Sequence, residues 1–283
     1  MNYLPMSDLL RDAQRRGYAV PAFCVWNSDV LATVLRVAER LRAPVIIMAS
    51  KFEFALMTPS MYAGMARGIA AHFSVPAALH LDHGPSLEMA RECIDAGFTS
   101  VMLDFSARPY DENAGALRQV VAWAHPHGIT VEGELGHVGK ADTITVEGEG
   151  DSTLTWPEEA VRYLKETGVD ALAVSIGNAH GNYTCLPSFD FDRLAAIRAA
   201  TTVPLVLHGG SGTPDNDLRR AIGLGMCKIN VATELTAAVR AALDTELDLE
   251  NPRWLPHSLT IAHEAVAPVI EKWIHLTGAA GRA

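Results

Sequence analysis

The sequence predicts an α/β fold, a single (β/α)8 TIM barrel with a C-terminal helical extension, and three observations lead to this prediction. Eight apolar segments of strand length alternate with amphipathic segments of helix length along the chain. Each apolar segment ends in a polar or reactive residue, and no low-complexity linker interrupts the series. A doubly wound open sheet is the alternative, but it would concentrate reactive residues at one switch point, whereas a closed barrel gathers all strand ends around one mouth.

The predicted strands are short and almost continuously apolar, which is typical of parallel strands buried on both faces. They comprise residues 18–24, 44–50, 75–82, 100–104, 129–134, 171–175, 203–208 and 227–230. Their polar ends are Cys24, Ser50, Asp82, Asp104, Glu134, Ser175, His208 and Asn230.

The segments between the strands repeat apolar residues at helical spacing. In the first of them, Val30 and Val34 share one face and Ser28 is the predicted N-cap. Ser86 is the predicted N-cap of a helix over residues 87–96. The other helices are predicted over residues 59–72, 112–124, 157–167, 190–200 and 214–224.

The C-terminal part of the chain continues past the eighth strand and helix unit. Residues from about 240 to 283 include a final predicted helix over residues 257–275. We therefore predict one barrel domain over residues 1–283, with a terminal appendage that covers the mouth or makes a subunit contact.

Composition and charge exclude several classes of protein. Hydrophobic residues make up 49% of the chain and charged residues 20%, as in ordinary globular proteins. The formal net charge of -10 argues against a nucleic-acid partner, because a phosphate backbone requires clustered Lys and Arg. The N-terminus lacks a basic region followed by an apolar core, and no apolar run approaches the roughly 20 residues that span a bilayer. The sequence thus predicts a cytoplasmic protein with no membrane partner.

The cysteines do not form a recognisable framework. Cys24, Cys93, Cys185 and Cys227 are widely separated with no paired spacing. This spacing disfavours both a disulfide framework and a thiolate zinc site. We interpret these cysteines mostly as small core residues.

Three histidines lie at or after the ends of different predicted strands: His83, His180 and His208. Three protein ligands and one open position are typical of a catalytic divalent metal, above all zinc. Each histidine alone is equally well explained as a cap or a core residue. Their shared position at strand ends favours a metal site.

Three carboxylates accompany these histidines. Asp82 immediately precedes His83, so it can face the same cavity and transfer protons, or alternatively hold a ligand imidazole in place. Asp104 and Glu134 end adjacent predicted strands and offer oxygen ligands for a second cation. A salt bridge to Arg or Lys in the mouth is the alternative for this second pair.

Two glycine-containing loops follow the last two predicted strands. Residues 208–212 read His-Gly-Gly-Ser-Gly, and residues 230–233 read Asn-Val-Ala-Thr and open a helix. In such barrels the loops after strands seven and eight form a common phosphate site from backbone amides and a helix N-terminus. A phosphorylated ligand is therefore predicted.

These motifs resemble those of the class II, metal-dependent ketose-bisphosphate aldolases, the family that contains fructose-bisphosphate and tagatose-bisphosphate aldolases. The resemblance runs from Leu9 to Arg253, and its most specific motifs are residues 79–84, 95–102, 134–136, 179–181, 208–212 and 228–234. It implies a zinc-dependent lyase that acts in carbohydrate metabolism, in a reaction of the kind found in glycolysis. Such an enzyme reversibly cleaves a ketose (bis)phosphate, such as fructose- or tagatose-1,6-bisphosphate, to dihydroxyacetone phosphate and an aldehyde such as glyceraldehyde 3-phosphate.

The resemblance also implies roles for individual residues. His83, His180 and His208 match the Zn²⁺ ligands, and Asp82 matches the acid/base at the carbon-4 oxygen. A second divalent cation is implied at Asp104 and Glu134, and a monovalent cation (Na⁺ or K⁺) near the phosphate site. Ser50 matches a contact to the aldehyde phosphate half of the substrate. The matches to dihydroxyacetone-phosphate contacts are Gly181, Gly209, Gly210, Ser211, Asn230, Val231, Ala232 and Thr233.

Arg253 resembles an arginine that the family lends to the far phosphate of a neighbouring subunit's substrate. The resemblance thus implies a homodimer or homotetramer. The chain departs from the family pattern in two places. Cys24 stands where the family usually has Asn, and Asp142 stands in place of a glutamate proposed as the carbon-3 base, two residues after a lysine that replaces a glycine. Glu147 is the alternative base.

Three other functions are open from the sequence. A Schiff-base aldolase would use Lys228, which alternates onto the same strand face as Asn230, but would leave the three histidines unexplained. A metal-dependent phosphosugar epimerase would share the barrel, the metal and the phosphate loops. A non-catalytic barrel kept for binding or assembly is the third possibility.

Overall fold

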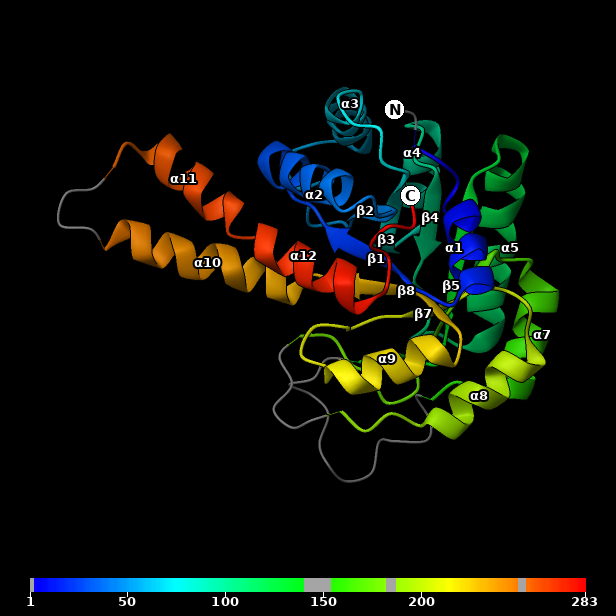
Figure 1. The fold of residues 1–283 in the computed structure, drawn as a ribbon. Helices are drawn as coiled ribbons and strands as arrows, with labels where there is room; N and C mark the ends of the chain where they lie inside the picture. The colour runs from blue at the N-terminus through cyan, green and yellow to red at the C-terminus, as the bar shows by residue number, and fades with distance from the viewer. Residues whose placement is uncertain (1–2, 140–153, 182–186, 249–252) are drawn as a thin grey trace.

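A closed barrel of parallel strands forms the centre of the molecule (Figure 1). The computed structural model describes residues 3–139, 154–181, 187–248 and 253–283. Within these ranges the strands follow one another around the barrel in chain order, and β8 closes the ring by pairing with β1. The strands are β1 (Val20–Cys24), β2 (Val45–Ala49), β3 (Ala77–Gly84), β4 (Ser100–Leu103), β5 (Thr130–Leu135), β6 (Ala171–Val174), β7 (Leu205–Leu207) and β8 (Met226–Val231). The predicted TIM barrel is confirmed.

Helices alternate with the strands and surround the barrel (Figure 1). They are α2 (Ser28–Arg40), α3 (Pro59–Ala70), α4 (Leu87–Asp95), α5 (Tyr110–Ala124) with the 3-10 turn η1 (His125–His127), α7 (Pro157–Thr167), α8 (Phe191–Ala200) and α9 (Asp215–Gly223). Their bounds agree with the predicted ranges to within about two residues, which is the usual uncertainty of helix ends. None of the described helices is both long and apolar enough to cross a membrane.

One predicted helix cap is correct and one is wrong. The Ser86 side chain accepts a hydrogen bond from Met89 N–H at the start of α4, as predicted. At α2 the cap is Asn27, whose side chain accepts from Val30 N–H over 2.9 Å, and Ser28 is already the first helical residue. Asparagine and serine cap almost equally well, so two adjacent candidates cannot be ranked by residue type alone.

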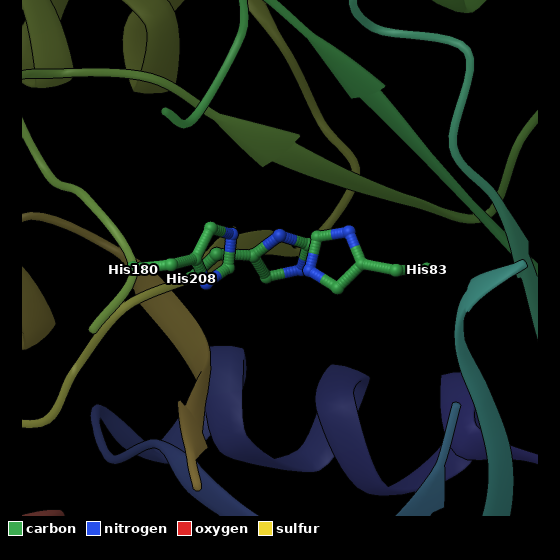
Figure 2. Close-up of side chains that lie close together, drawn as sticks. All are labelled: His83, His180 and His208. Atoms are coloured by element: carbon green, nitrogen blue, oxygen red, sulfur yellow. The ribbon is translucent and has the colours of Figure 1, made fainter. Parts of the chain in front are cut away.

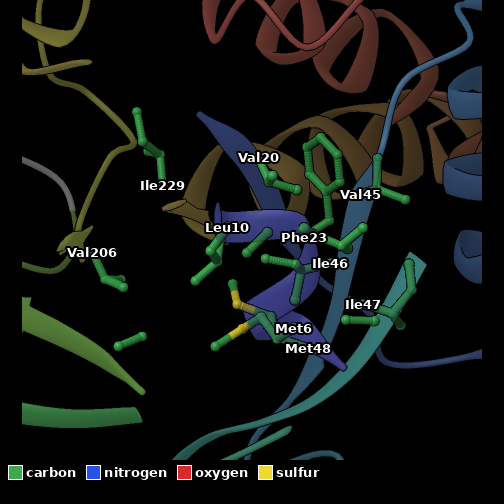
Figure 3. Packing of buried hydrophobic residues seen from close by; sticks show 14 of the residues in the cluster. Met6, Leu10, Val20, Phe23, Val45, Ile46, Ile47, Met48, Val206 and Ile229 are labelled. Carbon is green, nitrogen blue, oxygen red and sulfur yellow. The ribbon is translucent and has the colours of Figure 1, made fainter. Parts of the chain in front are cut away.

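An additional helix, α1 (Met6–Arg16), was not predicted from the sequence and precedes the first strand. Met6 and Leu10 are fully buried and lie beside barrel residues such as Met48 (Figure 3). The segment is tied to the beginnings of strands, because Leu4 N–H donates to Ala77 O, and Ser7 N–H donates to the side chain of Thr130. Helix α1 therefore covers the end of the barrel opposite the carboxyl ends of the strands.

The C-terminal extension consists of α10 (Thr233–Leu247), α11 (Leu255–Glu264) and α12 (Ala267–Leu276). Helices α10 and α11 lie side by side and project away from the barrel as an arm, whereas α12 packs against α2 and β1 (Figure 1). The prediction of a single helix over residues 257–275 was wrong, because the helix is interrupted between α11 and α12. Pro268 at the first turn of α12 explains the break, since proline is tolerated there and not in a helix interior.

Candidate metal and active site

Alternation along the strands places two layers of polar side chains inside the barrel. Successive strand residues point to opposite faces, so residues two apart share the interior face. The deeper layer, fully buried, consists of His80 on β3, Glu132 on β5 and Lys228 on β8. The layer above it, at the mouth, includes Asp82, Glu134 and Asn230 from the same strands, with His208 directly after β7.

The three predicted histidines meet at this mouth. His83 lies on β3, His180 follows β6 and His208 follows β7, and their rings converge in Figure 2. One ligand nitrogen from each lies within 4.8 Å of the others. The ring centroids are 4.6 Å apart for His83 and His208, and 4.8 Å apart for His83 and His180.

The donor atoms of these histidines fit a bound cation. Among the residues that the structure describes, His83 Nε2, His180 Nε2 and His208 Nδ1 are buried and have no hydrogen-bond partner. A buried polar atom without a partner costs about 1–3 kcal/mol, so three of them facing one another indicate that a ligand completes the site. Three imidazole nitrogens around one point are the donor set of a catalytic divalent metal, with zinc the best match.

His83 is held in position by Asp104. The ring Nδ1 lies 2.7 Å from Asp104 Oδ2, which leaves Nε2 as the free ligand atom. The other oxygen, Asp104 Oδ1, accepts hydrogen bonds from the backbone N–H and the hydroxyl of Ser106. Burial acts to raise the pKa of Asp104, but the bond to His83 and its charge outweigh burial and hold that pKa well below its usual range. Asp104 thus orients the His83 ring and stays ionised.

The backbone at His83 is unusual. Its φ is 46°, in the left-handed region that residues other than glycine rarely adopt. The pairing of β3 with β4 shifts register between Leu81 and Gly84, so the strand bulges at this point. Such a bulge re-aims a side chain, and here it turns His83 toward the two histidines from the other strands.

His208 is fixed by two glutamates of β5. Its Nε2 lies 3.0 Å from Glu132 Oε1, which leaves Nδ1 directed into the histidine cluster. That Nδ1 also lies 2.8 Å from Glu134 Oε2, but neither atom has the alignment of a hydrogen bond. Burial acts to lower the pKa of His208, but the adjacent Glu132 and Glu134 carboxylates outweigh burial and raise that pKa to about 10.

His180 lies on the loop that follows β6 and completes the histidine cluster. Its backbone N–H donates to Gly139 O over 2.8 Å, which ties the loop after β6 to the loop after β5. Burial, together with the charges of His83 and His208, lowers the pKa of His180 to about 4. The imidazole is therefore neutral near pH 7, the form that ligates a metal.

Asp82 lies beside the histidine cluster without belonging to it. Its Oδ1 accepts a hydrogen bond from Asn230 Nδ2 over 2.9 Å. Burial acts to raise the pKa of Asp82, but the charges of His83, Lys228 and His208 outweigh burial and lower that pKa. An ionised, oriented carboxylate next to a metal site is able to accept a proton from a bound substrate.

Asp104 and Glu134 lie near the first cluster, as the resemblance implied. Together with His83 they form a second group whose potential ligand atoms lie within 4.8 Å of one another. Glu134 Oε1 accepts from Val138 N–H, whereas Oε2 is buried with no hydrogen-bond partner among the described residues. A second cation position at these carboxylates stays a prediction.

The predicted phosphate loops lie together after β7 and β8. Gly209 has a φ of 67°, and a Cβ on Gly209 would collide with the carbonyl of Ala179 in the neighbouring loop. Gly210 N–H donates to Asn230 O, and the Ser211 hydroxyl accepts from Glu234 N–H in the first turn of α10. Helix α10 begins at Thr233, directly after Val231 and Ala232. A helix N-terminus enclosed by two close loops is a favourable site for a phosphate.

Two predicted residues lie away from this cluster. Ser50 follows β2, which lies between β1 and β3 in the barrel, and contacts Glu53. Arg253 lies at the distal end of the arm, where its Nε is 3.1 Å from Glu246 Oε2. Asp142 and Glu147, the two predicted candidates for the carbon-3 base, lie outside the described residues, as does Lys140.

The contacts within the deeper polar layer were not predicted from the sequence. Lys228 Nζ is 2.7 Å from Glu132 Oε2 and 3.0 Å from His80 Nε2, and all three side chains are fully buried. The alternation of Glu132 and Glu134 on one predicted strand was the available signal, since it places both acids on the same face. Because Lys228 is paired with Glu132 below the mouth, it is not a free amine facing the substrate, which argues against a Schiff-base aldolase.

We expect Lys228→Met to destabilise the folded protein by about 3–5 kcal/mol, because it leaves Glu132 charged, buried and without its cation. The double variant Lys228→Met/Glu132→Gln removes both charges and should recover part of that loss. Urea denaturation of the two variants and the wild type measures the difference. Equal stability of the single and double variants would show that the pair does not act as a buried ion pair.

Comparison with known proteins agrees with this geometry. The family model for fructose-bisphosphate aldolase class-II matches residues 4–282. The YdjI aldolase from Escherichia coli K12 is similar in structure, with a TM-score of 0.89, 34% sequence identity and 99% of each chain covered. The fructose-bisphosphate aldolase from Campylobacter jejuni has the same fold, with a TM-score of 0.84 and 22% identity over 98% of this chain and 95% of that chain. With nearly its whole length matched by the family model, the chain belongs to the class II fructose-bisphosphate aldolase family and is a lyase.

Proposed function

We propose that this aldolase depends on Zn²⁺ and cleaves the bond between carbons 3 and 4 of a ketose phosphate, giving dihydroxyacetone phosphate and an aldehyde. Fructose- and tagatose-1,6-bisphosphate are the reference substrates for the reaction. The observation that carries the proposal is the convergence of three buried imidazole nitrogens, within 4.8 Å of one another, beside the ionised Asp82. His83, His180 and His208 would hold the metal.

The chemistry that a divalent cation supplies at such a site is Lewis acidity, which stabilises negative charge developing on the ketose carbonyl oxygen. Asp82 accepts the proton of the carbon-4 hydroxyl while the bond between carbons 3 and 4 breaks. The carbon-4 oxygen becomes the aldehyde carbonyl, and the bonding electron pair remains with the three-carbon fragment. A proton delivered to carbon 3 completes dihydroxyacetone phosphate, and in condensation every step runs in reverse.

Other residues bind and orient the substrate. Asn230 fixes the direction of the Asp82 carboxylate through the 2.9 Å hydrogen bond from its amide. The phosphate of the dihydroxyacetone half lies between the loops at Gly181, Gly209, Gly210 and Ser211 and the N-terminus of α10 at Thr233. This site is favourable for an anion despite the net charge of -10, since the helix dipole supplies local positive potential.

The position of the arm formed by α10 and α11 is an argument for a homodimer or homotetramer. Helix α10 has 15 residues, so it carries the chain roughly 22 Å from its own phosphate site before Arg253 is reached. Trp254 and Leu255 beside Arg253 are 80% and 56% exposed, which is costly for large apolar side chains unless another surface covers them. We propose that the arm contacts a neighbouring subunit and brings Arg253 to it.

A two-part assay tests the proposed function with Zn²⁺-loaded protein. We expect solvent deuterium to enter carbon 3 of dihydroxyacetone phosphate in D₂O, because proton removal at carbon 3 needs no aldehyde. We also expect a new carbon–carbon bond when an aldehyde is added. Stereochemical exchange of a ketose phosphate without release of an aldehyde would instead identify an epimerase.

A further inference from the structure

The connection between β2 and α3 places an acidic side chain against Ser50. Glu53 Oε2 accepts from Ser50 N–H over 2.6 Å and from the Ser50 hydroxyl over 2.8 Å. The Ser50 oxygen in turn accepts a hydrogen bond from Phe52 N–H. Both donors that Ser50 could offer to a substrate phosphate are therefore directed at a carboxylate of the same protein.

The residue at the end of β1 points to the same carboxylate. Cys24 Sγ lies 3.5 Å from Glu53 Oε1, so each Glu53 oxygen has a donor from a different strand end. Burial raises the pKa of Cys24 well above its usual value, and the negative charges of Glu53 and Asp82 raise it further. Cys24 is thus a neutral donor to Glu53, and the charges of Glu53 and Asp82 act on the same part of the mouth.

The connection between β2 and α3 supplies little positive charge to balance this carboxylate. Lys51 is the only basic residue between positions 50 and 58, and it is exposed, with Nζ 5.2 Å from the centre of the Phe52 ring. Arg253, which the proposed function brings to a neighbouring subunit, is already paired with Glu246 at 3.1 Å. A second phosphate at this end of the substrate would meet a carboxylate of like charge at short range.

From these contacts we infer that Glu53 determines specificity at the end of the substrate remote from the metal, and that this end is an uncharged polyhydroxylated carbon chain. The inference rests on the proposed function, because it concerns the aldehyde half of the same reaction. The oxygens of Glu53 accept hydrogen bonds from substrate hydroxyl groups, in exchange for those from Ser50. The same oxygens reject a phosphate, since a repulsive element against the wrong ligand is a common source of specificity.

The test is aldol condensation of dihydroxyacetone phosphate with D-glyceraldehyde or with D-glyceraldehyde 3-phosphate, using Zn²⁺-loaded protein. We expect the wild type to have a kcat/KM at least about tenfold higher for the uncharged aldehyde, as like-charge juxtaposition disfavours the phosphorylated one. Glu53→Gln keeps the size and the acceptor oxygen but removes the charge. It should raise kcat/KM for the phosphorylated aldehyde by about tenfold and change that for glyceraldehyde by less than about threefold.

Glu92→Gln is the matched control, because it removes one carboxylate from the exposed face of α4 and should leave the preference unchanged. A wild-type preference for glyceraldehyde 3-phosphate would overturn the inference about Glu53, whereas the proposed function would stand. Failure of the proposed function itself gives a different result. If neither aldehyde reacts and no deuterium enters dihydroxyacetone phosphate, the proposed function itself fails. The wild-type preference needs no variant, so poor folding of Glu53→Gln does not prevent a decision.

Discussion

Asp82→Asn is expected to slow cleavage of the carbon–carbon bond by about 10²–10⁴-fold, the usual contribution of a positioned acid or base. Asparagine has almost the same shape as aspartate, and its side-chain oxygen can still accept the hydrogen bond from Asn230. It has no carboxylate to take the proton of the carbon-4 hydroxyl. Single-turnover cleavage of fructose 1,6-bisphosphate or fructose 1-phosphate measures the loss.

Zn²⁺ affinity separates this role from a role in holding the metal. The donor atoms at the proposed metal site belong to His83, His180 and His208, so Asp82→Asn should change Zn²⁺ affinity much less than it changes the rate. Asp95→Asn, which removes an exposed carboxylate from α4, is the control and should keep full activity. An undiminished cleavage rate in Asp82→Asn would assign the proton transfer to another group.

Removal of the metal is expected to lower activity by about a thousandfold, because Lewis-acid stabilisation of developing charge is worth several kcal/mol. Dialysis against dipicolinate followed by addition of Zn²⁺ should abolish and then restore cleavage. His180→Ala should give the same loss together with weaker Zn²⁺ binding, measured by calorimetry. His72→Ala is the matched control, since this exposed histidine follows α3 and is not part of the cluster.

Full activity after chelation, together with borohydride trapping of the substrate on the protein, would contradict the metal-dependent reaction. That result would require the amine of Lys228 to form a Schiff base. The pairing of Lys228 with Glu132 at 2.7 Å argues against this outcome.

The sequence was sufficient to predict the barrel and the convergence of its histidines. Strand ends in a closed parallel barrel meet at one mouth, so residues far apart in the chain, such as His83, His180 and His208, come together once the strands are assigned. Alternation of side chains then places Asp82 on the interior face. These predictions depend only on the alternation of side chains along each strand and on the closure of the barrel.

Other features depended on contacts that no local pattern reveals. Helix α1 has apolar residues at helical spacing, at Met6, Leu9, Leu10 and Ala13, but nothing in that pattern shows that it covers the end of the barrel. The hydrogen bonds between Glu53 and Ser50 depend on the conformation of the loop between β2 and α3. The spacing of apolar residues predicts strands and helices, but it does not predict the conformation of such a loop. A resemblance to a family assigns Ser50 to a phosphate without revealing the carboxylate that occupies it.

The left-handed backbone at His83 has a consequence for how the protein tolerates change. Holding a residue other than glycine in this conformation costs roughly 1–2 kcal/mol, a cost that glycine at position 83 would avoid. The same substitution would also remove the 2.7 Å contact to Asp104 and a proposed metal ligand. The backbone conformation and the proposed reaction therefore favour different residues at position 83, and the bond to Asp104 offsets part of the backbone cost of histidine.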